Sequence, residues 1–129
     1  MKSIVICSSN KFAKEARAFA KKLEKPGVRV LLPHFYRASG GDMERLPEFD
    51  RKFLAMGLVR DHFHKIDLAD AVFIFNKGGY AGNSTSVEIG YASALNKSLY
   101  ALAEDKDLSR AILFEGITRT PKELVQKLK

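Results

Sequence analysis

A short glycine-rich segment carries the residues of this chain that are best suited to chemistry. Residues 77–95 read KGGYAGNSTSVEIGYASAL, with Gly78, Gly79 and Gly82 close together and a single carboxylate, Glu88, farther on. A glycine turn that leads into a helix leaves backbone N–H groups free to hold a phosphate, a carboxylate or sugar hydroxyls. A lone carboxylate beside such a turn is well placed to act as a nucleophile or a base.

Glu88 also has a purely structural interpretation. The segment Thr85-Ser86-Val87-Glu88 matches the capping-box pattern Ser/Thr-x-x-Glu, in which the glutamate bonds back to the cap residue. A carboxylate in the first turn of a helix also suits the helix dipole. Asn83 or Ser84 could equally be the cap residue. The sequence therefore leaves both the helix cap and the role of Glu88 open.

Two common phosphate-binding motifs do not fit this segment. No Gly-Lys-Ser/Thr follows the glycines, so the segment is not a Walker A loop. The glycine spacing does not make GxGxxG, and the apolar run before it is not the first in the chain, which excludes the dinucleotide-binding fingerprint. The site has to be located from the elements around it.

Strand and helix patterns alternate along the chain. Short apolar runs bounded by turn residues predict buried strands, and apolar residues at helical spacing predict amphipathic helices. In a chain of 129 residues this alternation predicts one α/β domain, residues 1–129, with a five-stranded, parallel, doubly wound sheet in the flavodoxin-like order 2-1-3-4-5. The expected strands are 3–9, 28–35, 71–76, 98–103 and 111–117, and the expected helices are 11–25, 50–67, 84–96 and 120–128.

Some details of these elements are specific enough to be checked. In the last helix we expect Thr120 as the N-cap and Pro121 at the first helical position. The longest irregular stretch is 36–49, and loops of that length in compact domains are often functional lids. The helix over 50–67 is expected to bury one apolar face, formed by Met56, Val59, Phe63 and Ile66.

The predicted topology points back to the glycine-rich segment. Doubly wound sheets bind ligands beyond the carboxyl ends of their strands, where the strand order reverses. In the predicted order this point lies between the first and third strands, from which residues 7–10 and 76–85 emerge. The candidate binding residues in and beside these segments are Ser8, Ser9, Asn76, Gly78, Gly79, Tyr80, Gly82, Asn83, Ser84 and Ser86.

A family resemblance supports this location. The segment DLADAVFIFNKGGYAGNSTSVEIGYASALNKSLYAL resembles the core of the nucleoside 2-deoxyribosyltransferase superfamily, in which a strand after Ala-Asp and a glycine-bearing loop precede Glu-Ile/Leu-Gly-Tyr-Ala. The N-terminal segment ICSSNKFAKEARAFAKKLEKPGVRVLLP is similar to the family's first strand–helix–strand unit. The EIGYA segment is the most specific part of the resemblance.

The resemblance implies roles for several residues. Glu88 holds the position of the family's nucleophile, which attacks C1′ of a deoxyribonucleoside or its 5′-monophosphate and forms a glycosyl ester. We expect the helix dipole to keep this carboxylate ionised. Asp61 is the nearest match to an aspartate that helps to protonate the leaving base, and His62 beside it is a candidate substrate-binding residue. Relatives are homo-oligomers whose pockets are completed by a neighbouring subunit, so we expect a dimer or a higher oligomer, with Tyr91 or Tyr100 as candidate contacts.

The chain departs from the family pattern at two places. Cys7-Ser8-Ser9-Asn10 replaces a tyrosine and a Gly-Pro turn after the first strand, and Gly82 stands where some relatives carry an acidic residue that touches the sugar. Ser84 and Ser86 could bind a sugar hydroxyl or a 5′-phosphate instead. These changes are compatible with hydrolysis, with a phosphorylated substrate or with lost catalysis.

Two alternative functions remain open from the sequence. Residues 77–82 echo the Pro-Gly-Gly-x-Gly-Thr-x-x-Glu motif of phosphoribohydrolases of the cytokinin-activating kind, although the second part of the motif is offset. A nucleotide-binding or sensing domain without turnover would keep the glycine turn and tolerate the loss of Glu88.

Composition narrows the class of partner. The net charge of +7 comes from 22 Lys and Arg against 15 Asp and Glu, but these are spread over helix surfaces without a block of like charge. We therefore expect a nucleoside or nucleotide ligand and no specific nucleic-acid partner. No apolar run reaches the roughly 18 residues that span a bilayer, and the N-terminal run is short for a signal peptide, so we expect a cytoplasmic protein with no membrane partner.

The sequence offers no evident metal site. The single cysteine, Cys7, excludes an internal disulfide and a multi-cysteine zinc site, and is expected to pack as a small hydrophobic residue. His62 and His64 are two residues apart and do not face the same way on a helix. We therefore expect neither a metal nor another cofactor.

Overall fold

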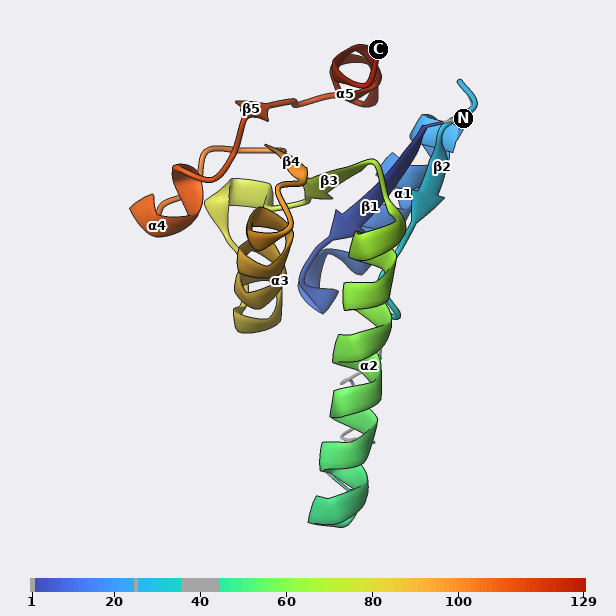
Figure 1. Cartoon of the computed structure of the whole chain (residues 1–129), viewed down its shortest axis with the longest axis vertical. Coiled ribbons are helices and arrows are strands. Elements are labelled where there is room, and N and C mark those ends of the chain that lie inside the picture. The colour runs from blue at the N-terminus through green and yellow to red at the C-terminus, as the bar shows by residue number, and fades with distance from the viewer. Residues whose placement is uncertain (1, 25, 36–44) are drawn as a thin grey trace.

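The structure is a parallel α/β sheet with helices on both faces (Figure 1). The computed structural model describes residues 2–24, 26–35 and 45–129. Five strands pair in parallel in the order β2-β1-β3-β4-β5, which confirms the predicted topology. The strands are β1 (Ser3–Cys7), β2 (Arg29–Leu31), β3 (Ala71–Ile74), β4 (Ser98–Ala101) and β5 (Gly116–Ile117). The helices are η1 (Asn10–Phe12), α1 (Ala13–Glu24), α2 (Glu48–Leu68), η2 (Lys77–Gly79), α3 (Asn83–Ala94), α4 (Leu108–Ala111) and α5 (Pro121–Lys127).

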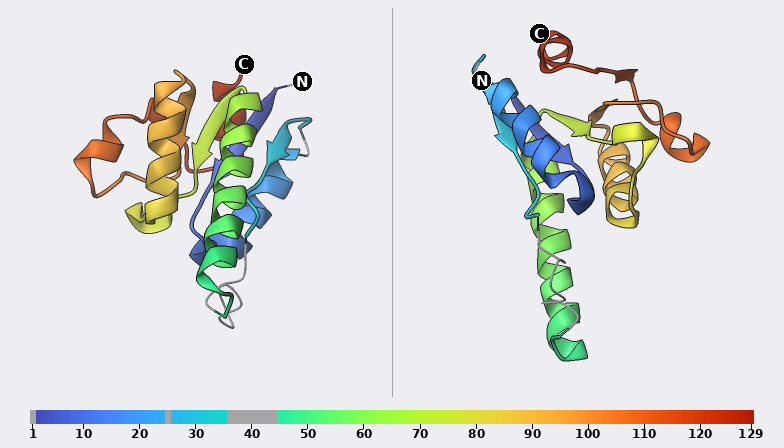
Figure 2. Two further views of the ribbon diagram at one scale, coloured as in Figure 1. Left: turned by 60° about the horizontal axis from the view of Figure 1, so that its bottom comes forward. Right: turned by 180° about the vertical axis from the view of Figure 1, so that it is seen from behind.

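Helices lie on both sides of the sheet (Figure 2). Each face of the sheet carries its own hydrophobic core. Successive side chains of a strand point to opposite faces, so β1 contributes to both cores. Ile4 and Ile6 pack with residues of α1 and α5, whereas Val5 and Cys7 pack with residues of α2 and α3. The last residue of β1 therefore points to the face that α2 and α3 cover.

Helix α2 extends well beyond the sheet (Figure 1). It has 21 residues, which corresponds to a length of roughly 31 Å. Its C-terminal half reaches the core through His62 and Ile66, which are buried. The predicted core face was therefore partly wrong, because Met56 and Val59 are 45% and 43% exposed on the projecting half. Among the described residues, no helix combines the length and the apolar character needed to cross a bilayer.

Several predicted element bounds change in the structure. The predicted fifth strand over 111–117 was largely wrong, because only Gly116–Ile117 pair with β4 and α4 precedes them. The second strand is limited to Arg29–Leu31. Tyr100 is buried in the core, so the structure does not place it at the surface as a candidate subunit contact. Most of the irregular 36–49 stretch lies outside the described residues.

The predicted starts of α3 and α5 can be compared with the structure. Thr120 caps α5 by accepting a hydrogen bond from the backbone N–H of Glu123, and Pro121 occupies the first helical position, as predicted. The cap of α3 is different from the prediction, because its N-cap residue is Gly82 and makes no side-chain cap bond. Glu88 consequently lies in the second turn of α3, and the capping-box interpretation of Thr85 and Glu88 was wrong.

The turn before α3 depends on glycine at two positions. Gly78 and Gly79 have φ angles of +67° and +79°, which side chains other than glycine rarely adopt. A Cβ atom on Gly79 would also lie 2.7 Å from the backbone oxygen of Glu104. This close approach fixes the path by which the chain leaves β3 and enters α3.

We expect Gly79→Ala to lower the free energy of unfolding by about 2–4 kcal/mol, because a positive φ and a backbone overlap act together. Gly57→Ala is the matched control, since Gly57 lies within α2 and has nothing within 4 Å of the added Cβ. The control should stabilise the helix by about 0.5–1 kcal/mol. Urea unfolding of both variants checks this, and equal stabilities would contradict it.

Candidate active site

A cavity of about 390 Å³ opens at the carboxyl edge of the sheet, between β1, α2 and α3. This is the strand-order switch point that the sequence predicted. Its volume lies in the range of small-molecule sites. The residues that line it are Ser8, Ser9, Asn10, Pro33, His34, Ala55, Leu58, Val59, His62, Gly82, Asn83, Ser84, Thr85 and Glu88.

Helix α3 brings Glu88 to the floor of this cavity. Thr85, Ile89 and Ala92 are the buried residues of α3, and Glu88 shares the face of Thr85 and Ala92 because it is three residues from the first and four from the second. Its side chain is only 13% exposed. The carboxyl group is therefore held between the helix and the sheet, with the cavity as its opening to solvent.

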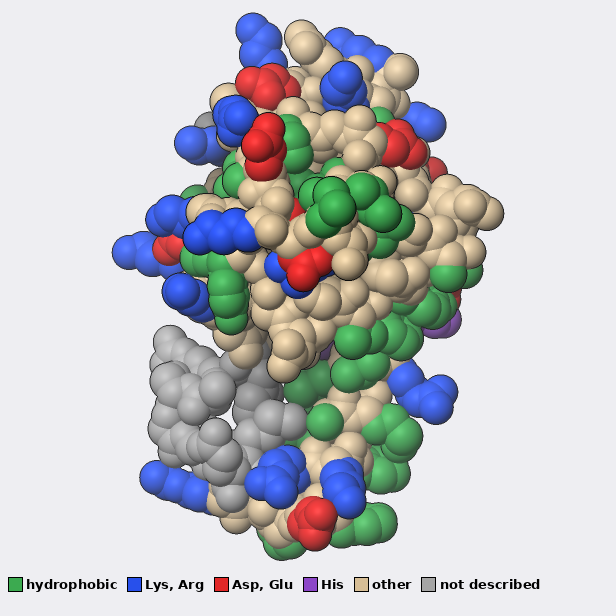
Figure 3. All heavy atoms as spheres, turned by 90° about the vertical axis from the view of Figure 1, so that its left-hand side faces the viewer, with side chains coloured by type: hydrophobic (Ala, Val, Ile, Leu, Met, Phe, Trp, Pro, Cys, Tyr) green, Lys and Arg blue, Asp and Glu red, His purple; other side chains and the backbone are tan. Residues whose placement is uncertain are grey.

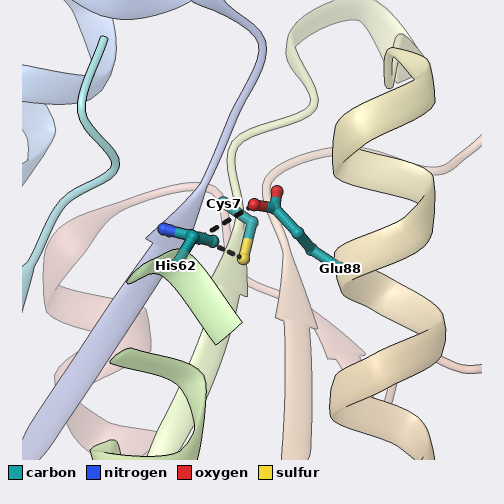
Figure 4. A group of neighbouring side chains, drawn as sticks. All are labelled: Cys7, His62 and Glu88. Carbon is teal, nitrogen blue, oxygen red and sulfur yellow. Dashed lines mark hydrogen bonds and ion pairs between the residues drawn. The ribbon is translucent and has the colours of Figure 1, made fainter. Parts of the chain in front are cut away.

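Helix α2 places His62 opposite Glu88. His62 lies one turn before the buried Ile66, and its side chain is 5% exposed. Its Nε2 atom lies 3.3 Å from Oε2 of Glu88. The same Nε2 lies 3.3 Å from Sγ of Cys7, which comes from the end of β1. Figure 4 shows these three side chains meeting from three different elements.

Burial controls the protonation of this group. Desolvation raises the pKa of Glu88 to about 8, and desolvation together with the nearby charge of Lys65 lowers the pKa of His62 to about 4. Burial and the charge of Glu88 also raise the pKa of the Cys7 thiol. A neutral carboxylic acid that donates a hydrogen bond to a neutral imidazole is thus favoured over an ion pair near neutral pH.

This result corrects the expectation that the helix dipole keeps Glu88 ionised. The dipole acts within the first turn of a helix, and Glu88 lies in the second turn of α3. No helix N–H group reaches its carboxylate in the hydrogen bonds found among the described residues. Desolvation is therefore the dominant effect on this carboxyl group.

The remaining walls of the cavity differ in polarity. Small polar residues form one side, namely Ser8 and Ser9, which follow β1, and Asn83 and Ser84 at the start of α3. Ala55, Leu58 and Val59 of α2 form an apolar side with Pro33. These α2 positions are spaced three or four residues apart and continue to His62, so one helix face lines the cavity.

The structure brings together some of the predicted site residues and separates others. Ser8, Ser9, His62, Gly82, Asn83, Ser84 and Glu88 all line the cavity. Asp61 does not line it, and instead forms ion pairs with His34 at 3.1 Å and with Lys65 at 2.9 Å. The hydrogen bond from Lys65, and the charges around it, hold the pKa of Asp61 below its usual value.

Five more predicted residues also lie outside the cavity and have structural contacts. The Asn76 side chain is fully buried and joins the ends of β3 and β4 through two hydrogen bonds with Ala103. Ser86 donates to the carbonyl of Gly82 and accepts from Arg110. The other three are the turn glycines Gly78 and Gly79 and the partly exposed Tyr80, whose ring packs edge-on against Phe12.

Sequence reasoning missed several residues of the site. Cys7 is buried as predicted, but its Sγ atom contacts Nε2 of His62 and lies within 4.8 Å of a carboxylate oxygen of Glu88. The alternation of side chains along β1 predicts the face of the sheet on which Cys7 lies, but it does not predict which side chains Cys7 contacts there. His34 and Pro33 follow the carboxyl end of β2 and therefore reach the cavity. Their position after a parallel strand was the available signal.

Comparison with known proteins establishes the fold. No protein-family model and no curated protein matches the sequence. A solved 2-deoxyribosyltransferase from the psychrotolerant bacterium Bacillus psychrosaccharolyticus, described as a biocatalyst for the synthesis of nucleosides, is similar over 95% of this chain and 89% of its own, with a TM-score of 0.64 and 16% identity. A conserved protein from Enterococcus faecalis V583 is similar over 99% and 97%, with a TM-score of 0.63 and 14% identity. The chain thus has a nucleoside 2-deoxyribosyltransferase-like fold.

The raised pKa of Glu88 predicts a pH-dependent stability. Between pH 6.5, where a histidine ordinarily titrates, and about pH 8, the folded state keeps the Glu88 proton that the unfolded state has lost. Below this interval the lowered pKa of His62 has the opposite effect, so the interval isolates Glu88. The free energy of unfolding should therefore fall by about 1–2 kcal/mol as the pH rises from 6.5 to 8. Glu88→Gln, which is neutral and of similar shape, should abolish that fall.

Thermal unfolding of both proteins at several pH values, in buffer containing a chelator, measures this effect. Glu48→Gln is the control, because Glu48 is an exposed glutamate of α2 paired only with Lys52 among the described residues. The control should behave like the wild type. A wild-type stability that is constant or rises over this interval would disprove the protonated state of Glu88.

Proposed function

We propose that this protein is an enzyme that cleaves or transfers the N-glycosidic bond of a nucleoside or its 5′-monophosphate, with Glu88 as the nucleophile. The observation that carries the proposal is the placement of one nearly buried carboxyl group, 3.3 Å from an imidazole, at the floor of the switch-point cavity. The fold shared with a 2-deoxyribosyltransferase and the resemblance around EIGYA support it.

The first step of the proposed mechanism frees the nucleophile. Glu88 donates its proton to Nε2 of His62, which lies within reach and is neutral before the transfer. Polar groups of a bound substrate replace part of the missing hydration and favour the carboxylate. His62 serves as the general base for Glu88 in this step.

The second step exchanges one bond at C1′ for another. A carboxylate oxygen of Glu88 forms a bond to C1′ while the bond from C1′ to the base nitrogen breaks, and its electron pair leaves with the base. The protonated His62 supplies the proton that the leaving base requires. Water or a second base then attacks C1′, the ester bond breaks and its electron pair returns to the Glu88 carboxylate. His62, neutral again after protonating the leaving base, accepts the proton that the attacking group loses and passes it to Glu88, which restores the starting state.

The two walls of the cavity suit the two parts of such a substrate. The apolar wall of Ala55, Leu58 and Val59 is compatible with a flat nucleobase, and the polar wall of Ser8 and Ser84 is compatible with sugar hydroxyls or a 5′-phosphate. We assign no catalytic role to Asp61, since its ion pairs favour the charged form and a carboxylate has no proton to give.

The test is release of free base from a panel of nucleosides and 5′-monophosphates, with and without an acceptor base. Glu88→Gln should lower turnover by at least about 10³-fold, and His62→Ala by about 10²–10⁴-fold. Glu48→Gln should leave the rate unchanged. A requirement for the acceptor identifies a transferase, and release without it identifies a hydrolase.

Two outcomes would contradict the proposal. The first is turnover that survives Glu88→Gln. The second is binding of a nucleotide by the wild type without base release on any substrate of the panel, which is the behaviour of a sensing domain.

We also propose that the protein forms a homo-oligomer through the projecting half of α2. Phe49, Phe53, Met56 and Val59 lie three or four residues apart and are between 43% and 77% exposed. Figure 3 shows hydrophobic side chains gathered on the lower, projecting part of the molecule that α2 forms. An exposed apolar stripe of this kind is typical of an interface, and a second copy can pair the same stripe with itself. Because Val59 also lines the cavity, the interface would border the site.

Phe53→Asp is expected to convert the oligomer to a monomer, because it places a charge within the apolar contact. Light scattering coupled to size-exclusion chromatography measures the mass. Leu108→Asp is the control, since Leu108 is 75% exposed on α4 and away from this stripe. A wild type that is monomeric at high concentration would contradict the proposal.

A further inference from the structure

We propose that Cys7, His62 and Glu88 form a binding site for a single zinc ion. The three side chains come from β1, α2 and α3, and each offers one donor atom to a common point. Their donor atoms all lie within 4.8 Å of one another. The sequence alone could not show this cluster, because its members are separated by 55 and 26 positions along the chain.

The spacing of the donor atoms suits a tetrahedral ion. Zinc binds sulfur at about 2.3 Å and nitrogen or oxygen at about 2.0–2.2 Å, which places tetrahedral ligand atoms roughly 3.3–3.7 Å apart. The distance from Sγ of Cys7 to Nε2 of His62 is 3.3 Å, and that from Nε2 to Oε2 of Glu88 is also 3.3 Å. Small side-chain rotations would therefore open the cluster to the geometry that zinc requires.

The chemistry of the donors selects the kind of metal. A thiolate, an imidazole and a carboxylate form a mixed set that favours zinc, whereas magnesium and calcium prefer oxygen ligands. The thiol proton, and the proton of Glu88 where present, leave to solvent when the ion binds. The resulting thiolate and carboxylate charges balance the two positive charges of the ion, which makes its burial acceptable.

The site also has an entry path and an open position. Cys7 is fully buried behind the other two residues, while His62 and Glu88 line the cavity. An ion can reach the cluster through this cavity, and its fourth ligand would be a cavity water or a bound molecule. Nδ1 of His62 has no hydrogen-bond partner among the described residues, so it is free to carry the ring proton when Nε2 binds the ion.

Occupation of this site has a consequence for the proposed reaction. The ion would hold Glu88 and Nε2 of His62, which are the nucleophile and its base. Zinc would then inhibit base release by competing with the substrate, and a chelator would restore it. This part of the inference rests on the proposed function, whereas the metal site itself does not.

Titration of the 129-residue chain with Co²⁺ tests the site without any need for turnover. Under reducing conditions, we expect one Co²⁺ per chain, an intense tetrahedral visible spectrum and a sulfur-to-cobalt charge-transfer band, all displaced by one equivalent of Zn²⁺. Cys7→Ser should abolish the charge-transfer band. His62→Ala should weaken zinc affinity by more than the roughly 10–100-fold that loss of an outer-sphere partner costs.

His64→Ala is the matched control, since His64 is an exposed histidine two residues from His62 on the same helix. It should bind like the wild type. Circular dichroism of each variant shows whether it is folded, and Cys7→Ser keeps the shape of the site if His62→Ala does not fold. A weak octahedral spectrum without a charge-transfer band, or equal affinity in Cys7→Ser, His62→Ala and His64→Ala, would overturn the metal site.

The two proposals fail in different ways. A tetrahedral cobalt spectrum in a protein that releases no base supports the metal site and contradicts the proposed activity. If base release depends on Glu88 but the protein gives no tetrahedral cobalt spectrum, the proposed activity is supported and the metal site is contradicted. If saturating zinc does not inhibit base release, the proposed competition between zinc and the substrate is wrong.

Discussion

The site depends on the close contact between Glu88 and His62 in a place with little access to water. Each group alone would be ionised or readily ionisable in solution, but burial penalises the charge on both. The contact of 3.3 Å allows them to share one proton as a neutral pair. In the proposed reaction, this arrangement would keep the carboxyl group protonated until a substrate fills the cavity, with His62 beside it as the base for its proton. The cavity walls, the glycine turn and the position of α2 all serve to hold these two groups together.

Three independent features of the fold produce this contact. Alternation along β1 turns Cys7 toward the face covered by α2 and α3. The two positive φ angles at Gly78 and Gly79 set where α3 begins, and hence place Glu88 on the buried face of its second turn. A single face of α2 passes from the core at Ile66 to the cavity at His62. A shift of one residue in any of these elements would separate the group.

The sequence predicted the sheet and the location of the site because hydrophobic periodicity and parallel topology are local or general properties. The strand order, the switch point and the cap at Thr120 followed from them. The length of the fifth strand was overestimated. The apolar run at 111–117 does not reveal that its first residues belong to the end of α4 and the turn after it. The environment of Glu88 was also missed, because its desolvation arises from packing between α2, α3 and β1. Likewise, the exposed face of α2 at Met56 has the same pattern as a core face.

If both proposals hold, Glu88 binds zinc in one state of the protein and attacks the substrate in another. The two states exclude each other because both use the same carboxylate. The central claim is that Glu88 itself becomes bonded to the sugar. The most direct test is acid quenching of a zinc-free reaction, followed by intact-protein and peptide mass spectrometry. We expect a mass increase on the peptide that contains Glu88 of one pentosyl group from a nucleoside, or of one pentosyl 5′-phosphate group from a 5′-monophosphate. The increase should be absent in Glu88→Gln. Base release with no adduct under any quench time, or an adduct on another residue, would contradict the claim.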